Sequence, residues 1–193
     1  MSSEQWFIDE TKVSGLTFAV VAAKSFDLGG CRTLLERLVA SPRHKSSGLH
    51  FHRESDATRS AAFRLIASMP ISVVLLTVPP GVKAVPARER AVRSVARRAL
   101  TQRPVRIIFE LDEAALVNDR RWLREEFGSR PAVEYQHFTK NSDPMLWVAD
   151  GIAWAVQRGG RWRKMIGVIG KNVDMGLLDS RSVPRVWGSG YGR

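Results

Sequence analysis

The segment WFIDETKVSGLTFAVVAA, residues 6–23, contains two apolar stretches joined by a short link with a glycine. The first stretch, residues 6–8, is followed at once by Asp9 and Glu10, and the second covers residues 16–23. Two short apolar stretches joined in this way are typical of a β-hairpin. The sequence therefore predicts two antiparallel strands at the start of the fold, with two acidic residues at the end of the first.

Helix and strand patterns alternate after this hairpin. Ser55 has the character of a helix cap, and the apolar run at residues 71–78 is typical of a strand covered on both faces. Further strands are predicted at residues 49–52, 105–109 and 132–138, and helices at residues 30–39, 55–69, 86–102, 113–127 and 144–157. This order predicts an α/β fold, in which a mixed sheet with an N-terminal β-hairpin is flanked by helices.

The chain has 193 residues, enough for one domain of ordinary size. We expect this domain to occupy residues 1–158. Residues 159–193 are basic and rich in glycine, so we expect an extended, poorly packed C-terminal tail. The single cysteine, Cys31, and an N-terminus unlike a signal peptide favour a cytoplasmic protein. No apolar stretch is long enough to predict a membrane span.

A strong excess of basic residues predicts a polyanionic partner. The net charge is +11 and the pI is about 10.8, which favours nucleic acid first and an anionic membrane surface or an acidic protein next. The candidate phosphate contacts lie on one face of the helix at residues 86–102 and in the tail: Arg90, Arg93, Arg97, Arg161, Arg163 and Lys164. The alternative is that the helix presents an ordinary solvated face.

Asp150 is the only charged residue between Pro144 and Gln157, in a stretch that otherwise predicts an apolar helix. A helix that is apolar all round is normally buried. A buried carboxylate needs an ion pair, hydrogen bonds or a bound cation, because an isolated one costs several kcal/mol. Asp150 is therefore predicted either to have a structural partner, such as a buried arginine or a backbone amide, or to bind a metal ion.

Other carboxylates stand where apolar strands end, which is where sites form in open α/β sheets. Asp9 and Glu10 should point to opposite faces of the sheet, whereas Glu110 and Asp112 should share a face. With Asp150 they are the candidate ligands of Mg²⁺ or Mn²⁺, ions that prefer carboxylate oxygens. The alternative is that these acids cap loops or pair with lysine and arginine side chains.

Four short motifs resemble those of a large family of bacterial and phage domains of unknown function, which is assigned to the ribonuclease H-like superfamily. They are FIDET at residues 7–11, LHF at residues 49–51, VRIIFE at residues 105–110 and NSDPMLWVAD at residues 141–150. The last motif is the most specific. The resemblance covers about residues 5–158.

The resemblance implies a ribonuclease H-like fold and a metal-dependent nuclease that hydrolyses the phosphodiester bonds of nucleic acid. By matching position, it implies Asp9, Glu110 and Asp150 as the catalytic acids and Mg²⁺ or Mn²⁺ as the cofactor. His50, in the LHF motif, would place a water or a phosphate beside these acids.

The sequence departs from the family pattern at Gly48, where many members have Glu, and at Trp147, which replaces a Gln. The strand at residues 71–78 also ends without the acid that authentic ribonuclease H places there. The alternative function is a non-catalytic protein that binds nucleic acid or another partner and keeps the fold with a degenerate site. A third hypothesis is a zinc site formed by His50, His52 and His137. Its alternative is that these histidines are solvated or hydrogen-bonded within the core.

Overall fold

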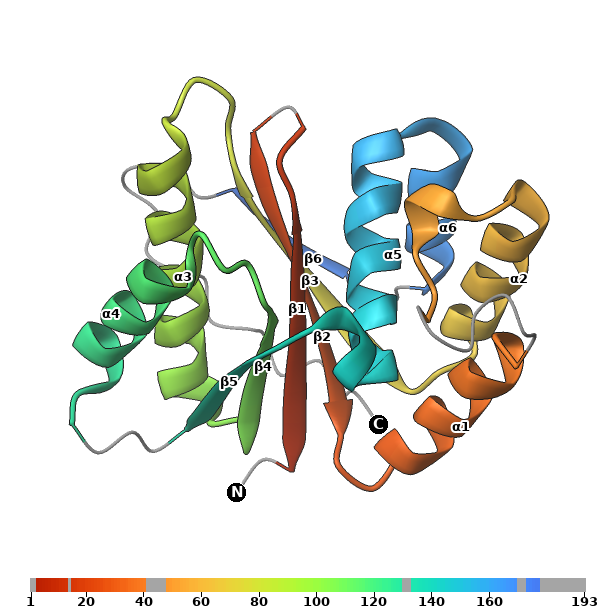
Figure 1. Cartoon of the computed structure of the whole chain (residues 1–193), viewed down its shortest axis with the longest axis horizontal. Coiled ribbons are helices and arrows are strands. Elements are labelled where there is room, and N and C mark those ends of the chain that lie inside the picture. Colours follow the sequence, from red (N-terminus) through yellow and green to blue (C-terminus); the bar gives the residue numbers. More distant parts are fainter. Residues whose placement is uncertain (1–2, 14, 41–47, 130–132, 170–172, 178–193) are drawn as a thin grey trace, which may run out of the picture.

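The computed structural model describes residues 3–13, 15–40, 48–129, 133–169 and 173–177 (Figure 1). It contains a six-stranded mixed sheet with the strand order β5-β4-β1-β2-β3-β6. The strands are β1 (Glu4–Thr11), β2 (Leu16–Lys24), β3 (Ile71–Val78), β4 (Arg106–Glu110), β5 (Glu134–Phe138) and β6 (Val173–Leu177). The helices are α1 (Leu28–Leu38), α2 (Asp56–Ala67), α3 (Ala84–Gln102), α4 (Leu116–Phe127), α5 (Pro144–Arg158) and α6 (Gly160–Ile169), with the 3₁₀ helices η1 (Phe51–Arg53) and η2 (Lys140–Ser142).

β1 lies between β2 and β4 in the middle of the sheet. It pairs antiparallel with β2, which confirms the predicted hairpin, and parallel with β4. The register places Ile8 of β1 opposite Phe109 of β4. Since parallel strands end at the same edge of a sheet, Asp9 and Glu110 are brought to neighbouring positions at that edge.

Two helical layers cover the two faces of the sheet (Figure 1). Successive residues of a strand point to opposite faces: Phe7 packs in the core shared with α1, α2, α5 and α6, and Ile8 packs in the core shared with α3 and α4. The predicted α/β fold with a mixed sheet flanked by helices is therefore confirmed. The apolar helix α5 packs directly on β1 and β2, which explains why almost all its residues are apolar.

Two local predictions were wrong, the strand at residues 49–52 and the extended tail from residue 159. Residues 49–52 do not form a strand, because Phe51 begins the 3₁₀ helix η1 and its ring is fully buried. Residues 160–169 are not extended, since they form α6, whose Trp162 and Ile166 are buried in the core beside α5. Residues 173–177 also have regular structure, as β6 pairs parallel with β3. The rest of the predicted tail, residues 178–193, lies outside the described residues.

The described helices include none that is long and apolar enough to cross a membrane.

Candidate active site

Three carboxylates from three elements converge on one lysine ammonium. The Lys140 Nζ atom lies 2.9 Å from Oδ1 of Asp150, 3.3 Å from Oε2 of Glu110 and 3.6 Å from Oδ2 of Asp9. All four side chains are largely buried, with 10% to 23% of their surface exposed. The structure thus brings together the three acids that the sequence analysis singled out, and it places a cation between them.

The fold fixes where each acid stands. Asp9 lies near the end of β1 and Glu110 is the last residue of the parallel neighbour β4. Asp150 is held by α5, whose start is fixed by Asp143: its Oδ1 accepts a hydrogen bond from the Met145 amide, and its two carboxylate oxygens accept two more from Arg32. Such an N-cap, followed by proline at the first helical position, strongly favours helix initiation at that point.

Among the described residues, Asp150 has two direct partners. Besides the ion pair with Lys140, its Oδ2 accepts a hydrogen bond of 3.1 Å from the Phe51 backbone amide. Phe51 approaches α5 closely, because a Cβ atom at Gly151 would lie only 2.5 Å from its ring. A buried carboxylate in an apolar helix therefore has both the amide and the cation that its burial requires.

The charges in this cluster do not balance, because three carboxylates face a single ammonium. Burial raises the pKa of Asp9 well above its usual value, and the hydrogen bond and negative charge of Glu110 raise it further. Burial opposes ionisation of Lys140, but the charges of Asp150, Asp9 and Glu110 outweigh it and raise the pKa of the ammonium. Among the described residues, Oε2 of Glu110 is buried without a hydrogen-bond partner, and it forms an ion pair with Lys140 at 3.3 Å. Negative charge is therefore in excess in this cluster, which favours the binding of a further positive charge.

Sequence reasoning missed Lys140. It lies in η2, between β5 and the α5 cap, and it follows a strand that ends at the same edge of the sheet as β1 and β4. The usable signal was its position ten residues before Asp150 in a chain segment that had to pass the acidic edge.

Glu10 and Asp112 belong to a different cluster on the α3 and α4 side of the sheet. Arg88 contacts Glu10 at 2.6 Å, Asp112 at 3.7 Å and the fully buried Asp119 at 2.8 Å. Lys12 bridges Glu10 and Asp112 from outside, at 3.2 Å and 2.9 Å. The prediction that Glu110 and Asp112 share a face is wrong, because β4 ends at Glu110 and the following loop turns toward Arg88.

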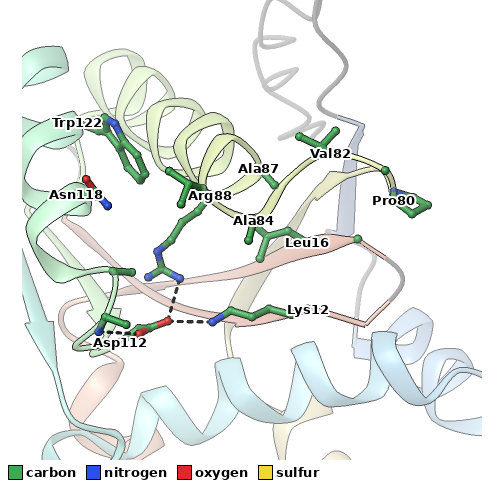
Figure 2. Close-up of a pocket in the computed structure, with 15 residues that line it drawn as sticks. Lys12, Leu16, Pro80, Val82, Ala84, Ala87, Arg88, Asp112, Asn118 and Trp122 are labelled. Atoms are coloured by element: carbon green, nitrogen blue, oxygen red, sulfur yellow. Dashed lines mark hydrogen bonds and ion pairs between the residues drawn. The ribbon is translucent and has the colours of Figure 1, made fainter.

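A cavity of about 550 Å³ opens beside this second cluster (Figure 2). Its walls come from the β1–β2 hairpin, the β3–α3 loop, the first turns of α3, and α4 with the loop before it. In Figure 2 Lys12, Arg88 and Asp112 interact along one side, while the ring of Trp122 and the side chain of Leu16 supply apolar surface. The three carboxylates around Lys140 do not line this cavity.

The three histidines do not form a zinc site. His137 stacks on Phe109 at 5.2 Å and faces Asp119 at 3.5 Å, so it lies on the α3 and α4 side of the sheet. His50 and His52 lie together on the other side, with ring centroids 5.9 Å apart. Among the described residues, no group of three or more His, Cys, Asp or Glu is arranged to hold a metal ion, and the position between the three carboxylates is taken by the Lys140 ammonium. His50 immediately precedes Phe51, the residue whose amide binds Asp150.

The departures from the family pattern at Gly48 and Trp147 are physically linked. Gly48 has a positive φ of 64°, and a Cβ atom there would lie 2.6 Å from the indole of Trp147. The buried Trp147 ring therefore fills the space that a side chain at position 48 would need. A fourth carboxylate at position 48 is incompatible with Trp147 in its present position.

The candidate phosphate-binding residues differ in whether they already form ion pairs within the protein. Arg93 pairs with Glu89, Glu125 and Glu126, and Arg97 also pairs with Glu126, so these two arginines mainly tie α3 to α4. Arg90, on the same helix, is exposed. On α6, Arg163 and Lys164 are exposed, and the exposed Arg161 pairs with Asp56 of α2.

The comparisons with known proteins identify the fold. No family model matches the chain, and no curated protein matches it. Among solved structures, RNase HII in its complex with PCNA from Archaeoglobus fulgidus is similar, with a TM-score of 0.50 and 19% identity over 84% of this chain and 75% of that chain. Ribonuclease H2 from Pyrococcus horikoshii OT3 matches with a TM-score of 0.48 and 11% identity over 84% and 75%. The chain therefore has the ribonuclease H-like fold that the sequence predicted.

Proposed function

We propose that this protein is a metal-dependent nuclease that hydrolyses the phosphodiester bonds of nucleic acid. One observation carries the proposal: Asp9 of β1, Glu110 of β4 and Asp150 of α5 surround a single cation at the edge of the sheet. Nothing in the ordinary packing of an α/β domain requires three buried carboxylates to meet. The proposal rests on this cluster, since the likeness to RNase HII concerns the fold alone.

The donor set suits a hard divalent cation. Carboxylate oxygens are the protein ligands that Mg²⁺ and Mn²⁺ prefer, and here three of them lie around one position, within 3.6 Å of Nζ of Lys140. Asp9, Glu110 and Asp150 would hold the ion after their side chains move closer together, because they are now arranged around the Lys140 ammonium. When bound, such an ion activates a water and stabilises the leaving oxygen of a phosphodiester. His50, next to the amide that binds Asp150, is the residue proposed to place the water or the phosphate.

Nucleic acid is the proposed substrate because the chain has a net charge of +11. The exposed basic side chains of α6 belong to the same helical layer as Asp150, since α6 packs on α5. They are therefore better placed to contact the substrate phosphates than the arginines of α3, which lie on the other face of the sheet. We propose that Arg161, Arg163 and Lys164 make those contacts.

An assay on labelled DNA and RNA, single- and double-stranded, tests this function. The wild type should cut at least one substrate with Mn²⁺ and none with a chelator, and Asp150→Asn should lower the rate by a factor of about 100 or more, as expected when a group essential to the chemistry is lost. Asp112→Asn is the matched control, because it makes the same change in the cluster around Arg88 and should cut normally. Equal cutting by Asp150→Asn, or no cutting of any substrate, would show the proposal to be wrong.

A second candidate is a non-catalytic protein that binds nucleic acid with a degenerate site. The observation in its favour is Lys140, whose ammonium already satisfies part of the carboxylate charge. This function predicts binding that weakens steeply with salt, survives Asp9→Asn and Asp150→Asn, and is never accompanied by cleavage.

A further inference from the structure

We propose that Lys140 is the resident counter-ion of the carboxylate cluster, and that a divalent cation enters the cluster only by displacing its ammonium. The inference deepens the proposed function, on which it rests, by adding a competitor to the metal site. It follows from the position of one atom, Nζ of Lys140, which lies within 3.6 Å of an oxygen of each acid.

The ammonium and a metal ion would compete for the same place. An ion bound by all three carboxylates would have to lie near the point where Nζ now stands, because the three acids surround that point. Two cations a few ångströms apart in a largely buried site repel each other strongly, since burial lowers the effective dielectric constant. Displacement of Lys140 is therefore part of metal binding and weakens the apparent affinity for the metal.

The local structure allows Lys140 to leave. Its backbone belongs to the short 3₁₀ helix η2, and the neighbouring residues Thr139, Asn141 and Ser142 are exposed. A lysine has a flexible four-carbon stem and a strongly hydrated ammonium, so Nζ can move from the cluster to nearby solvent while the backbone stays in place. The backbones of the three acids, in contrast, are held in place by β1, β4 and α5, so that only their side chains need to rotate toward the metal ion.

Without any cation the cluster would be unstable. Lys140 is the only basic side chain with an ion pair to Asp9, Glu110 or Asp150 within the described part of the chain. Its loss would leave three buried carboxylates facing one another, and like charges at such distances disfavour the folded state. Lys140 thus keeps the metal-free protein folded, a role that the metal takes over when it binds.

Calorimetric titration of the metal-free protein with Mn²⁺ tests the competition. Lys140→Met removes the charge but keeps a straight side chain, and it should bind Mn²⁺ about tenfold more tightly than the wild type, or more. Lys83→Met removes the same charge from an exposed position just before α3 and should leave the affinity unchanged within about twofold. Lys140→Gln, whose amide can still donate to Asp150, replaces Lys140→Met if that variant does not fold without metal.

Urea unfolding gives a readout independent of activity. Lys140→Met should unfold at a lower urea concentration than the wild type without metal, and Mn²⁺ should stabilise the variant more than the wild type. Unchanged or weaker Mn²⁺ binding by both Lys140 variants would overturn the inference. Tighter binding without cleavage of any nucleic acid would instead contradict the proposed nuclease function and leave the counter-ion role supported.

Discussion

The Asp9 carboxylate lies in surroundings that are unfavourable for a negative charge. Its side chain is buried beside Glu110 and Asp150, and only the Lys140 ammonium, 3.6 Å away, offsets them. Its carboxylate also accepts a hydrogen bond from the Glu10 amide, so its orientation is fixed by its own strand. A carboxylate kept in such surroundings costs stability, which is a common property of residues retained for function.

Asp9→Asn should stabilise the metal-free protein at neutral pH. The pKa of Asp9 is raised in the folded state by burial and by Glu110, so the folded protein binds this proton more tightly than the unfolded chain. Asp9 therefore costs nothing below its unfolded pKa of about 3.9 and destabilises increasingly as the pH rises through its folded value. Urea unfolding should show Asp9→Asn more stable by about 1 kcal/mol or more at pH 7, with the gain disappearing toward pH 4. A loss of stability at pH 7 would contradict this.

Arg88, unlike Asp9, stabilises the protein. It belongs to the second cluster, on the α3 and α4 side of the sheet. It donates two hydrogen bonds to the fully buried Asp119 and one to Glu10. In the described part of the chain, Arg88→Met would leave only His137, at 3.5 Å, as an ion-pair partner of the Asp119 side chain. We expect a loss of about 3–5 kcal/mol in urea unfolding, the usual result of removing one partner of a buried pair. Arg93→Met, which breaks more exposed pairs, should cost only about 1 kcal/mol; equal losses would mean that the burial of Asp119 has little effect.

Helix α5 and the 3₁₀ helix η1 form the element that presents Asp150. The sequence predicted α5 correctly from its apolar composition, which is a local signal, and the structure adds the Asp143 cap before Pro144. It could not predict η1, since Leu49-His50-Phe51-His52 alternates like a strand and is bent by a tertiary contact: the Phe51 ring packs against Gly151. Lys140, the partner of Asp150, was also missed, because its position shortly before α5 is the only local signal and no motif marks it.

Gly151→Ala tests this contact between the two elements. The added methyl group would meet the buried Phe51 ring at about 2.5 Å, and overpacking of this kind costs about 1–3 kcal/mol. Gly167→Ala in α6 is the matched control, because nothing lies within 4 Å of its Cβ position and alanine favours a helix over glycine by about 0.5–1 kcal/mol. Thermal unfolding should thus move in opposite directions for the two variants; stabilisation by Gly151→Ala would contradict the close packing.

The order of helices and strands along the chain predicted the layers of the fold, but not which strands are neighbours in the sheet. The apolar strand β3 was expected from its sequence, yet only the three-dimensional structure shows that β4 pairs with β1 rather than lying beyond β3. That pairing decides whether Glu110 can reach Asp9, so the cluster depends on sheet topology, which residue patterns do not specify. The sequence analysis did not predict α6, because glycines and basic residues surround its buried residues Trp162 and Ile166 and weaken the helical pattern.

The two basic surfaces of the molecule should contribute unequally to nucleic-acid binding. Replacing Arg161, Arg163 and Lys164 together by Gln should weaken binding and reduce the slope of log K against log salt by up to about three units. The same change at Arg90, Arg93 and Arg97 should alter the slope less, because two of these arginines are already paired with glutamates of α4. Fluorescence anisotropy at several salt concentrations measures both slopes. A larger effect of the α3 variant would place the nucleic acid on the other face of the sheet.

Anomalous diffraction from crystals soaked in Mn²⁺ tests most directly whether Asp9, Glu110 and Asp150 hold a metal ion. We expect one strong peak between Asp9, Glu110 and Asp150, at a coordination distance of about 2.1 Å from their oxygens, with the Lys140 ammonium withdrawn from the cluster. No peak there, with Nζ of Lys140 still between the carboxylates at Mn²⁺ concentrations of several millimolar, would contradict it. The three acids would then form a structural ion-pair cluster, and the claim that they hold a catalytic metal would be wrong.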